Sequence, residues 1–262
     1  MIKLICIDVD GTLIGSSGEL EDGILEKAEG LRAKGIRISI CTGRPGFGKT
    51  YGWAKALDPH GWHIFQSGAS ILGDSTSLST PLPVQAVEML YQERINRGWV
   101  LEWYSDQDWT VDSEHIFAVD HARLLGLPYE KKSLFDLQGT PIRAQWIVPH
   151  EDVQTVLANP IDGLECHTAT SPVMPDASFI SMTARGVSKA SAIQTVAKRL
   201  GMDLSEVMMV GDAPNDISAF AVVGHSVAMG NADQYTKSRA NHGVSHVDSG
   251  GLLEAFSLAE QI

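Results

Sequence analysis

The chain lacks the features of a secreted or membrane-spanning protein. Among its 262 residues only three are cysteines, Cys6, Cys41 and Cys166. An odd number without metal-ligand spacing argues against a disulfide framework, so we expect reduced thiols. No stretch approaches the roughly 20 apolar residues that span a bilayer, and the apolar run at the N-terminus stops at Asp8, too early for a signal peptide. These absences predict a cytoplasmic protein with no membrane partner.

Basic residues are also scarce. The sequence has 20 Lys and Arg against 32 Asp and Glu, a formal net charge of −12. Because this excess of negative charge repels polyanions, we expect no nucleic-acid partner. Hydrophobic residues make up 44% of the chain, which is typical of a globular protein with a substantial core. We expect a monomer or a homodimer.

Both ends of the chain alternate short apolar runs with helical patterns, and this alternation predicts a parallel α/β sheet. The predicted strands of these regions are residues 4–7, 36–41, 62–65, 207–211 and 226–229. The predicted helices are residues 20–34, 45–57, 214–223 and 251–259. The fold class is therefore α/β, with a Rossmann-like, doubly wound parallel sheet as its core.

The middle of the chain has a different pattern. Thr80-Pro81-Leu82-Pro83 is typical of a hinge, because proline fixes φ and begins helices at their first position. Helices and strands are mixed beyond it, at residues 84–96, 99–104, 109–111, 114–125, 142–148, 164–168 and 178–182. We predict an inserted α+β cap domain over residues 82–183, within a core domain of residues 1–81 and 184–262.

Two carboxylates follow the first predicted strand, in Asp8-Val9-Asp10-Gly11-Thr12-Leu13. Ligands of open parallel sheets bind at the carboxyl ends of the strands. Mg²⁺ prefers oxygen ligands and is usually bound by one or two carboxylates and a substrate phosphate, and a carboxylate beside it can attack phosphorus to form an aspartyl-phosphate. A solvated surface turn is the structural alternative, but the apolar strand before the pair favours a functional site.

Three further motifs lie at predicted strand ends or helix starts. Thr42-Gly43-Arg44 offers a hydroxyl and backbone N–H groups to an anion, although it also fits an ordinary helix cap. Lys189 begins a helix, where a lysine is unfavourable unless an anion compensates it; alone, it is more often a solvated lysine. Gly211-Asp212-Ala213-Pro214-Asn215-Asp216 adds two carboxylates, which would complete a magnesium site.

In their order, these four motifs resemble those of the haloacid dehalogenase-like (HAD) superfamily of Mg²⁺-dependent phosphatases. The large insert and two flanking segments are similar to subclass IIB, the Cof-type hydrolases; the segments are Gly186-Val187-Ser188-Lys189 and Ser226-Val227-Ala228-Met229-Gly230-Asn231-Ala232. The resemblance implies a phosphoric monoester hydrolase for small phosphorylated metabolites, such as sugar phosphates, with Mg²⁺ as its cofactor. Relatives usually carry Asn-Gly-Ala after the third strand, where this chain has Gln66-Ser67-Gly68-Ala69.

The resemblance also implies a role for each motif residue. Asp8 would be the nucleophile, and Asp10 would serve as general acid and then as general base. The implied metal ligands are Asp8, Asp10 (through its backbone carbonyl), Asp212 and Asp216, the last either directly or by holding waters or Lys189. The implied phosphate-binding residues are Thr42, Gly43, Lys189 and Asn215.

Three alternatives stay open. A phosphomutase shares the nucleophile but transfers the phosphoryl group to a sugar acceptor. Gly43-Arg44-Pro45-Gly46-Phe47-Gly48-Lys49-Thr50 matches the P-loop pattern G-x-x-x-x-G-K-[ST], but nucleotide binding there leaves the aspartates and Lys189 unexplained. A binding module descended from the family would be expected to lose a carboxylate, and all four are present.

The predicted cap has its own composition. Six acidic residues and no Lys or Arg lie between Gly98 and Ala122. If part of this stretch lines the cleft, a polyhydroxyl monophosphate fits better than a polyanion. The aromatic side chains in and beside it could stack on a sugar, although we expect most of them to pack in the core; they are Trp99, Trp103, Tyr104 and Trp109.

Overall fold

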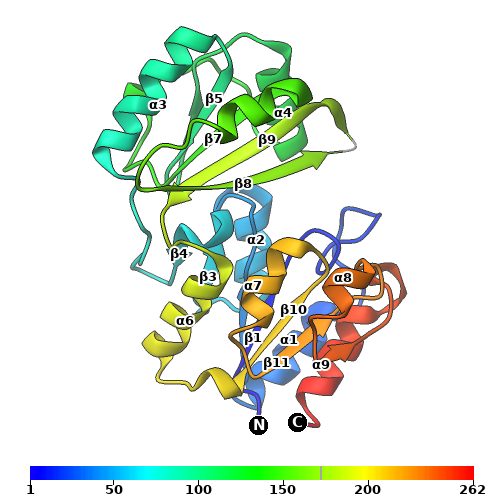
Figure 1. The fold of residues 1–262 in the computed structure, drawn as a ribbon. Helices are drawn as coiled ribbons and strands as arrows, with labels where there is room; N and C mark the ends of the chain where they lie inside the picture. Colours follow the sequence, from blue (N-terminus) through cyan, green and yellow to red (C-terminus); the bar gives the residue numbers. More distant parts are fainter. Residues whose placement is uncertain (172) are drawn as a thin grey trace. The chain divides into compact units, whose positions relative to one another are not determined.

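The computed structural model describes residues 1–171 and 173–262, and they form two compact units. The first unit consists of residues 1–44, 50–78 and 188–262, and the second of residues 45–49 and 79–187. Figure 1 labels the helices and strands of both. None of the described helices is both long and apolar enough to cross a membrane.

A five-stranded parallel sheet forms the centre of the first unit, in the order β12-β11-β10-β1-β2. Its strands are β1 (Leu4–Ile7), β2 (Arg37–Ile40), β10 (Val207–Gly211), β11 (His225–Ala228) and β12 (His242–Gly243). The chain starts at β1, adds β2 on one side of it and then adds β10, β11 and β12 in turn on the other. Such a reversal of strand order is where doubly wound sheets bind their ligands. A short antiparallel pair, β3 (His63–Phe65) and β4 (Ser70–Leu72), completes the strands of this unit.

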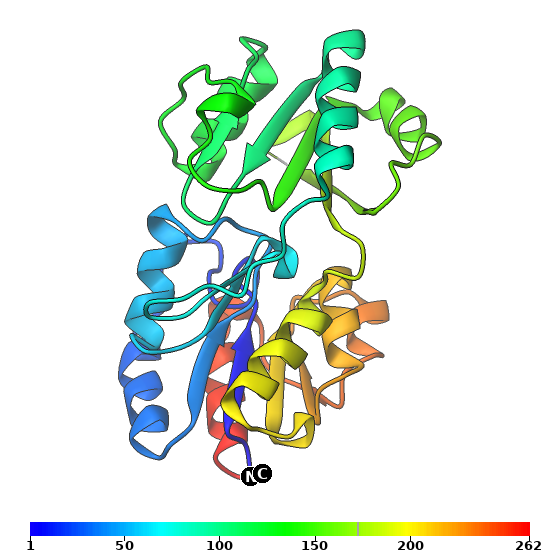
Figure 2. The same ribbon diagram turned by 90° about the vertical axis from the view of Figure 1, so that its left-hand side faces the viewer.

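Helices cover both faces of this parallel sheet, because side chains along a strand alternate between its faces. Ile5 and Ile7 pack with α1, α2 and α9, whereas Leu4 and Cys6 pack with α6 and α7. The helices are α1 (Ile24–Ala33), α2 (Gly48–Leu57), α6 (Lys189–Leu200), α7 (Ile217–Phe220), α8 (Gln234–Lys237) and α9 (Gly251–Ala259). Figure 2 shows α1 and α6 on opposite sides of the strands. The predicted doubly wound α/β fold is confirmed.

The second unit is built on a five-stranded antiparallel sheet in the order β6-β5-β7-β9-β8. Its strands are β5 (Val100–Tyr104), β6 (Trp109–Val111), β7 (Arg143–Pro149), β8 (Leu164–Ser171) and β9 (Met174–Ala184). Its helices are α3 (Val84–Arg97), α4 (Ile116–Leu125) and α5 (Val153–Leu157). Leu101 and Trp103 pack with α3 and α5, whereas Val100 and Tyr104 pack with α4, so this sheet too is covered on both faces.

Several helices begin or end away from the predicted positions. The helix predicted from residue 20 begins at Ile24, because Gly23 has a φ of 86° and interrupts the helical backbone. The helix predicted over residues 214–223 is a 3₁₀ turn, Pro214–Asp216, followed by the four residues of α7. Four short elements, β4, β12, α5 and α8, were not predicted.

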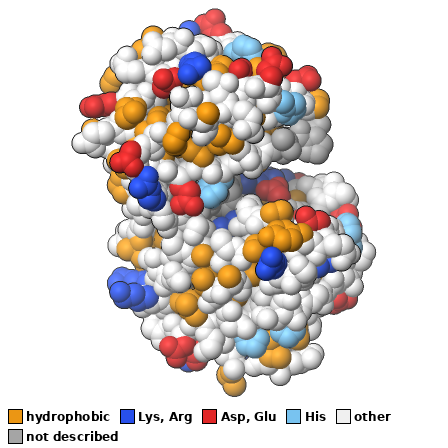
Figure 3. All heavy atoms as spheres, in the orientation of Figure 1, with side chains coloured by type: hydrophobic (Ala, Val, Ile, Leu, Met, Phe, Trp, Pro, Cys, Tyr) orange, Lys and Arg blue, Asp and Glu red, His pale blue; other side chains and the backbone are white. Residues whose placement is uncertain are grey.

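Charged side chains of both signs are mixed on the surface. On the face that Figure 3 shows, Lys and Arg stand apart from one another among acidic and apolar groups. That face therefore presents no broad basic area.

Candidate functional site

Three aspartates meet at the carboxyl edge of the parallel sheet in the first unit. Asp8, Asp212 and Asp216 each offer a carboxylate oxygen, and these oxygens lie within 4.8 Å of one another. Asp8 follows β1 and Asp212 follows β10, and the two strands pair with Ile7 beside Val210. The register of two neighbouring strands thus brings together motifs from opposite ends of the chain.

Lys189 joins two of these aspartates. Its Nζ donates to Asp8 Oδ1 at 2.6 Å and to Asp216 Oδ1 at 2.7 Å, and the side chain is only 2% exposed. Burial lowers the pKa of Lys189, but the charges of Asp216 and Asp8 outweigh it and raise the pKa above its ordinary value. The lysine is therefore held as a cation, and the two carboxylates provide the compensation that its place at a helix start requires.

The carboxylates of this cluster repel one another. Burial raises the pKa of Asp8 to about 8, with the charge of Asp216 adding to the shift and Lys189 opposing it. Burial and the charge of Asp216 raise the pKa of Asp212 to about 6. A divalent cation between the carboxylates would relieve this repulsion, and a ligand set made only of oxygen atoms suits Mg²⁺. The residues present therefore fit a magnesium ion.

Asp216 is already held by protein donors. Its Oδ1 accepts from Lys189, and its Oδ2 accepts from the backbone N–H groups of Asp212 at 3.0 Å and Ala213 at 3.1 Å. The side chain is fully buried. This arrangement suits a residue that positions Lys189 and the 212–213 loop better than one that binds the metal directly.

Asp212 is oriented by two polar neighbours. Asn231 Nδ2 donates to Asp212 Oδ2 at 3.1 Å and to the Gly11 carbonyl at 2.8 Å, and Thr12 Oγ1 lies 3.4 Å from Asp212 Oδ1. Gly11 has a φ of 78°, and a Cβ there would lie 2.2 Å from Asp212 Oδ2, so this position requires glycine. Asn231 had no predicted contact with Asp212. Its place shortly after β11, the strand beside β10, is the signal that could have indicated one.

The side chain of Asp10 lies outside the cluster of three aspartates. It is 62% exposed, and Arg44 holds both of its oxygens, with Nη2 at 2.6 Å from Oδ1 and Nε at 2.9 Å from Oδ2. The backbone N–H of Arg44 donates to Thr42 Oγ1 at 3.2 Å, which ties the 42–44 loop together. The sequence predicts Arg44 only as part of an anion site and does not predict its fork-like pairing with Asp10.

The remaining predicted residues differ in their placement. Thr42 is buried and Gly43 half-buried in the loop that follows β2. Asn215 is exposed in the 3₁₀ turn before α7, and its side chain makes no hydrogen bond to any residue that the structure describes. In the P-loop-like segment, Lys49 is exposed in the first turn of α2, whereas Thr50 is buried.

Known proteins identify the family of this chain. The profile of the haloacid dehalogenase-like hydrolases matches residues 5–256. The chain belongs to this family. The predicted HAD family and its hydrolase class are thereby confirmed.

Relatives and solved structures align with more than nine-tenths of the chain. The 5-amino-6-(5-phospho-D-ribitylamino)uracil phosphatase of Bacillus subtilis is 27% identical, with 92% of this chain and 89% of that protein covered. A haloacid dehalogenase-like hydrolase from Bacteroides thetaiotaomicron has a TM-score of 0.86 at 24% identity, covering 98% of this chain and 99% of the other. A subclass IIB sugar phosphatase has a TM-score of 0.83 at 22% identity, covering 99% and 100%. The two structural likenesses establish the fold.

The acidic stretch in the second unit of this HAD hydrolase is largely used for its own structure. Glu102 is fully buried and accepts hydrogen bonds from Tyr104 Oη at 2.7 Å and Gln145 Nε2 at 3.1 Å, with His121 Nδ1 at 2.8 Å. The other five acidic residues also have partners within the unit: Asp106 with Ser79, Asp108 with Gln138, Asp112 with Arg94, Glu114 with Lys131 and Asp120 with Arg123. Their charges therefore give little support to a choice of substrate.

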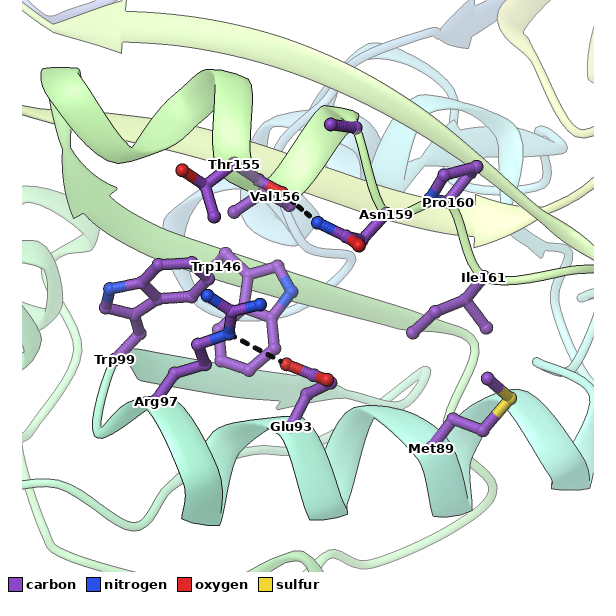
Figure 4. A pocket seen from close by; sticks show the side chains of 11 residues that line it. Met89, Glu93, Arg97, Trp99, Trp146, Thr155, Val156, Asn159, Pro160 and Ile161 are labelled. Atoms are coloured by element: carbon purple, nitrogen blue, oxygen red, sulfur yellow. Dashed lines mark hydrogen bonds and ion pairs between the residues drawn. The ribbon is translucent and has the colours of Figure 1, made fainter.

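A pocket of about 440 Å³ lies within the second unit, and side chains of α3 and of the α5 region line it (Figure 4). Trp99 and Trp146 meet edge to face there with centroids 5.8 Å apart, and Arg97 lies over Trp99 and pairs with Glu93. None of the predicted catalytic, metal-binding or phosphate-binding residues lines this pocket, whereas Trp99, one of the candidates for stacking on a sugar, does. Trp103, Tyr104 and Trp109 are buried, so core packing is confirmed for these three aromatic residues.

Proposed function

We propose that this HAD hydrolase is a Mg²⁺-dependent phosphatase of small phosphate monoesters, with Asp8 as its nucleophile. The observation that carries the proposal is the buried contact of Lys189 with both Asp8 and Asp216, beside Asp212. One edge of the sheet thereby holds a nucleophile, a fixed cation and oxygen ligands for a metal. The name of the Bacillus subtilis relative describes a phosphatase of a small phosphorylated metabolite, which supports this substrate class.

Asp8 and Asp10 divide the chemical work in this proposal. A carboxylate oxygen of Asp8 attacks phosphorus, and the bond from phosphorus to the ester oxygen breaks with its electron pair on that oxygen, which takes a proton from Asp10. Asp10 then accepts a proton from water as the water oxygen attacks phosphorus, and the bond to Asp8 breaks to release phosphate. Arg44 orients Asp10 by holding both of its oxygens. When Asp10 carries the proton that it donates, one of these two contacts is lost.

Lys189 and the 42–44 loop hold the phosphoryl group. Phosphoryl transfer spreads negative charge over the equatorial oxygens, so most of the catalysis is positioning and charge stabilisation. The Lys189 ammonium lies next to the attacking carboxylate, and Thr42, Gly43 and Asn215 are the further phosphate-binding residues of the proposal. Mg²⁺, when bound, would supply positive charge that stabilises the phosphoryl oxygens. Asp8, the Asp10 backbone carbonyl and Asp212 would hold it.

The division of labour between domains is also part of the proposal. Residues 1–81 and 184–262 form the catalytic core, which contains every catalytic and phosphate-binding residue named above. Residues 82–183 form the cap that selects the leaving group. Nucleotide binding at Gly43–Thr50 would leave Asp8, Asp212 and Lys189 without a role, and Lys49 is exposed in the first turn of α2.

Phosphate release with and without Mg²⁺ tests this function. The protein is assayed with 4-nitrophenyl phosphate and a panel of phosphorylated metabolites in the absence of any sugar acceptor, first with MgCl₂ and then with EDTA. We expect release with MgCl₂ only, and a loss of more than about 1,000-fold in Asp8→Asn. Asp22→Asn, an exposed aspartate of the same unit, is the matched control and should retain full activity.

Two results would contradict the proposal. Full activity of Asp8→Asn, or of the wild type in EDTA, would refute the nucleophile or the metal. Transfer of the phosphoryl group to an added sugar phosphate, with no release of phosphate in the absence of that acceptor, would identify a phosphomutase instead.

A further inference from the structure

The turn that follows β3 has an unusual backbone. Gln66 and Ser67 have φ values of 52° and 58°, and they are the only non-glycine residues with positive φ in the described ranges 1–171 and 173–262. Gly68 follows with a φ of 105°. Side chains with a Cβ rarely adopt this left-handed conformation. Residues kept in it are held there by their surroundings, and they cluster at functional sites.

Two parts of the proposed phosphate site hold this turn in place. The backbone N–H of Gln66 donates to the Arg44 carbonyl and that of Ser67 donates to the Thr42 carbonyl, both at 2.9 Å. Gly68 lies against the helix start on the other side, since a Cβ there would be 2.3 Å from the carbonyl oxygen of Ser188. The turn therefore connects the 42–44 loop to the residue before Lys189.

The hydroxyl of Ser67 lies beside the phosphate-binding loop without a partner of its own. Ser67 Oγ is 3.4 Å from the point that a Cβ on Gly43 would occupy. Within the part of the chain that the structure describes, this hydroxyl makes no hydrogen bond, and the residue is partly exposed. A glycine would adopt this left-handed conformation without the steric cost of a Cβ. The presence of a serine instead indicates that its side chain has a function.

We propose that Ser67 is a further substrate-binding residue, whose hydroxyl donates a hydrogen bond to a phosphoryl oxygen on the Gly43 side of the site. This inference rests on the proposed function, because it takes the 42–44 loop as the phosphate-binding loop. The ligand class is a phosphate monoester or its product, inorganic phosphate. A hydroxyl donor to a charged oxygen strengthens binding without adding charge.

Two substitutions at this position separate the hydroxyl from the backbone. Ser67→Ala removes the hydroxyl and keeps the cost of a Cβ in the left-handed region. Ser67→Gly removes both. In the presence of MgCl₂ we expect the two variants to bind inorganic phosphate about 10-fold more weakly by calorimetry, and to lose a similar factor in kcat/KM. Only Ser67→Gly should raise the Tm. Ser249→Ala, at an exposed serine of the same unit, should change none of these values.

The outcomes distinguish this inference from the proposed function. Phosphate binding by Ser67→Ala at the wild-type affinity overturns the role of the hydroxyl, even if Asp8→Asn abolishes hydrolysis. If Ser67→Ala binds phosphate more weakly and Ser67→Gly does not, the effect comes from the backbone, and the role of the hydroxyl is again overturned. If both variants bind phosphate more weakly but the wild type hydrolyses no monoester, the Ser67 contact is supported and the proposed phosphatase activity is refuted.

Discussion

Replacing Lys189 by methionine should destabilise the first unit and abolish phosphate release. The substitution keeps a long apolar stem but removes the ammonium that contacts Asp8 at 2.6 Å and Asp216 at 2.7 Å. The carboxylates of both aspartates are nearly inaccessible, with side-chain exposures of 7% and 0%. Without Lys189, no cationic side chain that the structure describes would contact both carboxylates.

The size of the effect follows from this burial. Removing one partner of a buried ion pair costs about 3–5 kcal/mol, because the remaining charge is left uncompensated. The whole free energy of unfolding of such a protein is about 5–15 kcal/mol, so the loss is a large share of it. Mg²⁺ held by Asp8 and Asp212 would replace part of the missing charge. We therefore expect the difference between variant and wild type to be smaller in MgCl₂ than in EDTA.

Urea denaturation followed by circular dichroism measures this difference, with each protein titrated in EDTA and in MgCl₂. Lys198→Met is the matched control, because Lys198 is exposed in the last turn of the same helix, and its change should stay within about 0.5 kcal/mol. In MgCl₂, phosphate release by Lys189→Met should fall by more than about 100-fold. A variant as stable as the wild type in EDTA would refute the reasoning, because the buried carboxylates would then not depend on the lysine.

Three other substitutions test separate parts of the account. Gly11→Ala should abolish phosphate release, since its Cβ would lie 2.2 Å from Asp212 Oδ2, and an active variant would contradict this. The control Gly30→Ala, on the exposed face of α1, should instead raise the free energy of unfolding by about 1 kcal/mol. Arg44→Ala should lower kcat for alkyl phosphates about 10-fold more than for 4-nitrophenyl phosphate, whose leaving group needs no proton; equal losses would contradict the pairing with Asp10. Burial lowers the pKa of His63 from 6.5 to about 4 in the folded protein. Because the unfolded chain binds this proton more tightly than the folded protein does, the free energy of unfolding falls as the pH drops from about 6.5 towards 4. His63→Gln should remove about 2 kcal/mol of the stability lost between pH 7 and pH 5 in urea titrations, and an unchanged loss would contradict this prediction.

The fold could be predicted because its strands and helices carry clear periodic signals. The run Leu4–Ile7 is apolar at every position, as expected of a parallel strand covered on both faces, and its side chains divide between two cores. The elements that were missed are short. β12 has two residues and α8 has four, too few for any hydrophobic period to appear.

The sequence predicts those residues of the site that directly follow a strand. Asp8 and Asp212 lie together because their strands are neighbours, which topology dictates. Side-chain orientation depends on partners that only the folded chain supplies. The pairing of Asp10 with Arg44 is indicated by no local pattern in the sequence. The contact of Asn231 with Asp212 could be inferred only from the order of β10 and β11 in the sheet.

The central claim is that Asp8 carries the phosphoryl group during the reaction. Rapid acid quenching of the enzyme during turnover of 4-nitrophenyl phosphate with MgCl₂, followed by borohydride reduction and peptide mass spectrometry, locates the modified carboxylate directly. We predict reduction of Asp8 to homoserine in the wild type, and no reduced aspartate in the peptide of Asp8→Asn. A phosphorylated residue other than Asp8, or steady phosphate release by Asp8→Asn, would contradict the account.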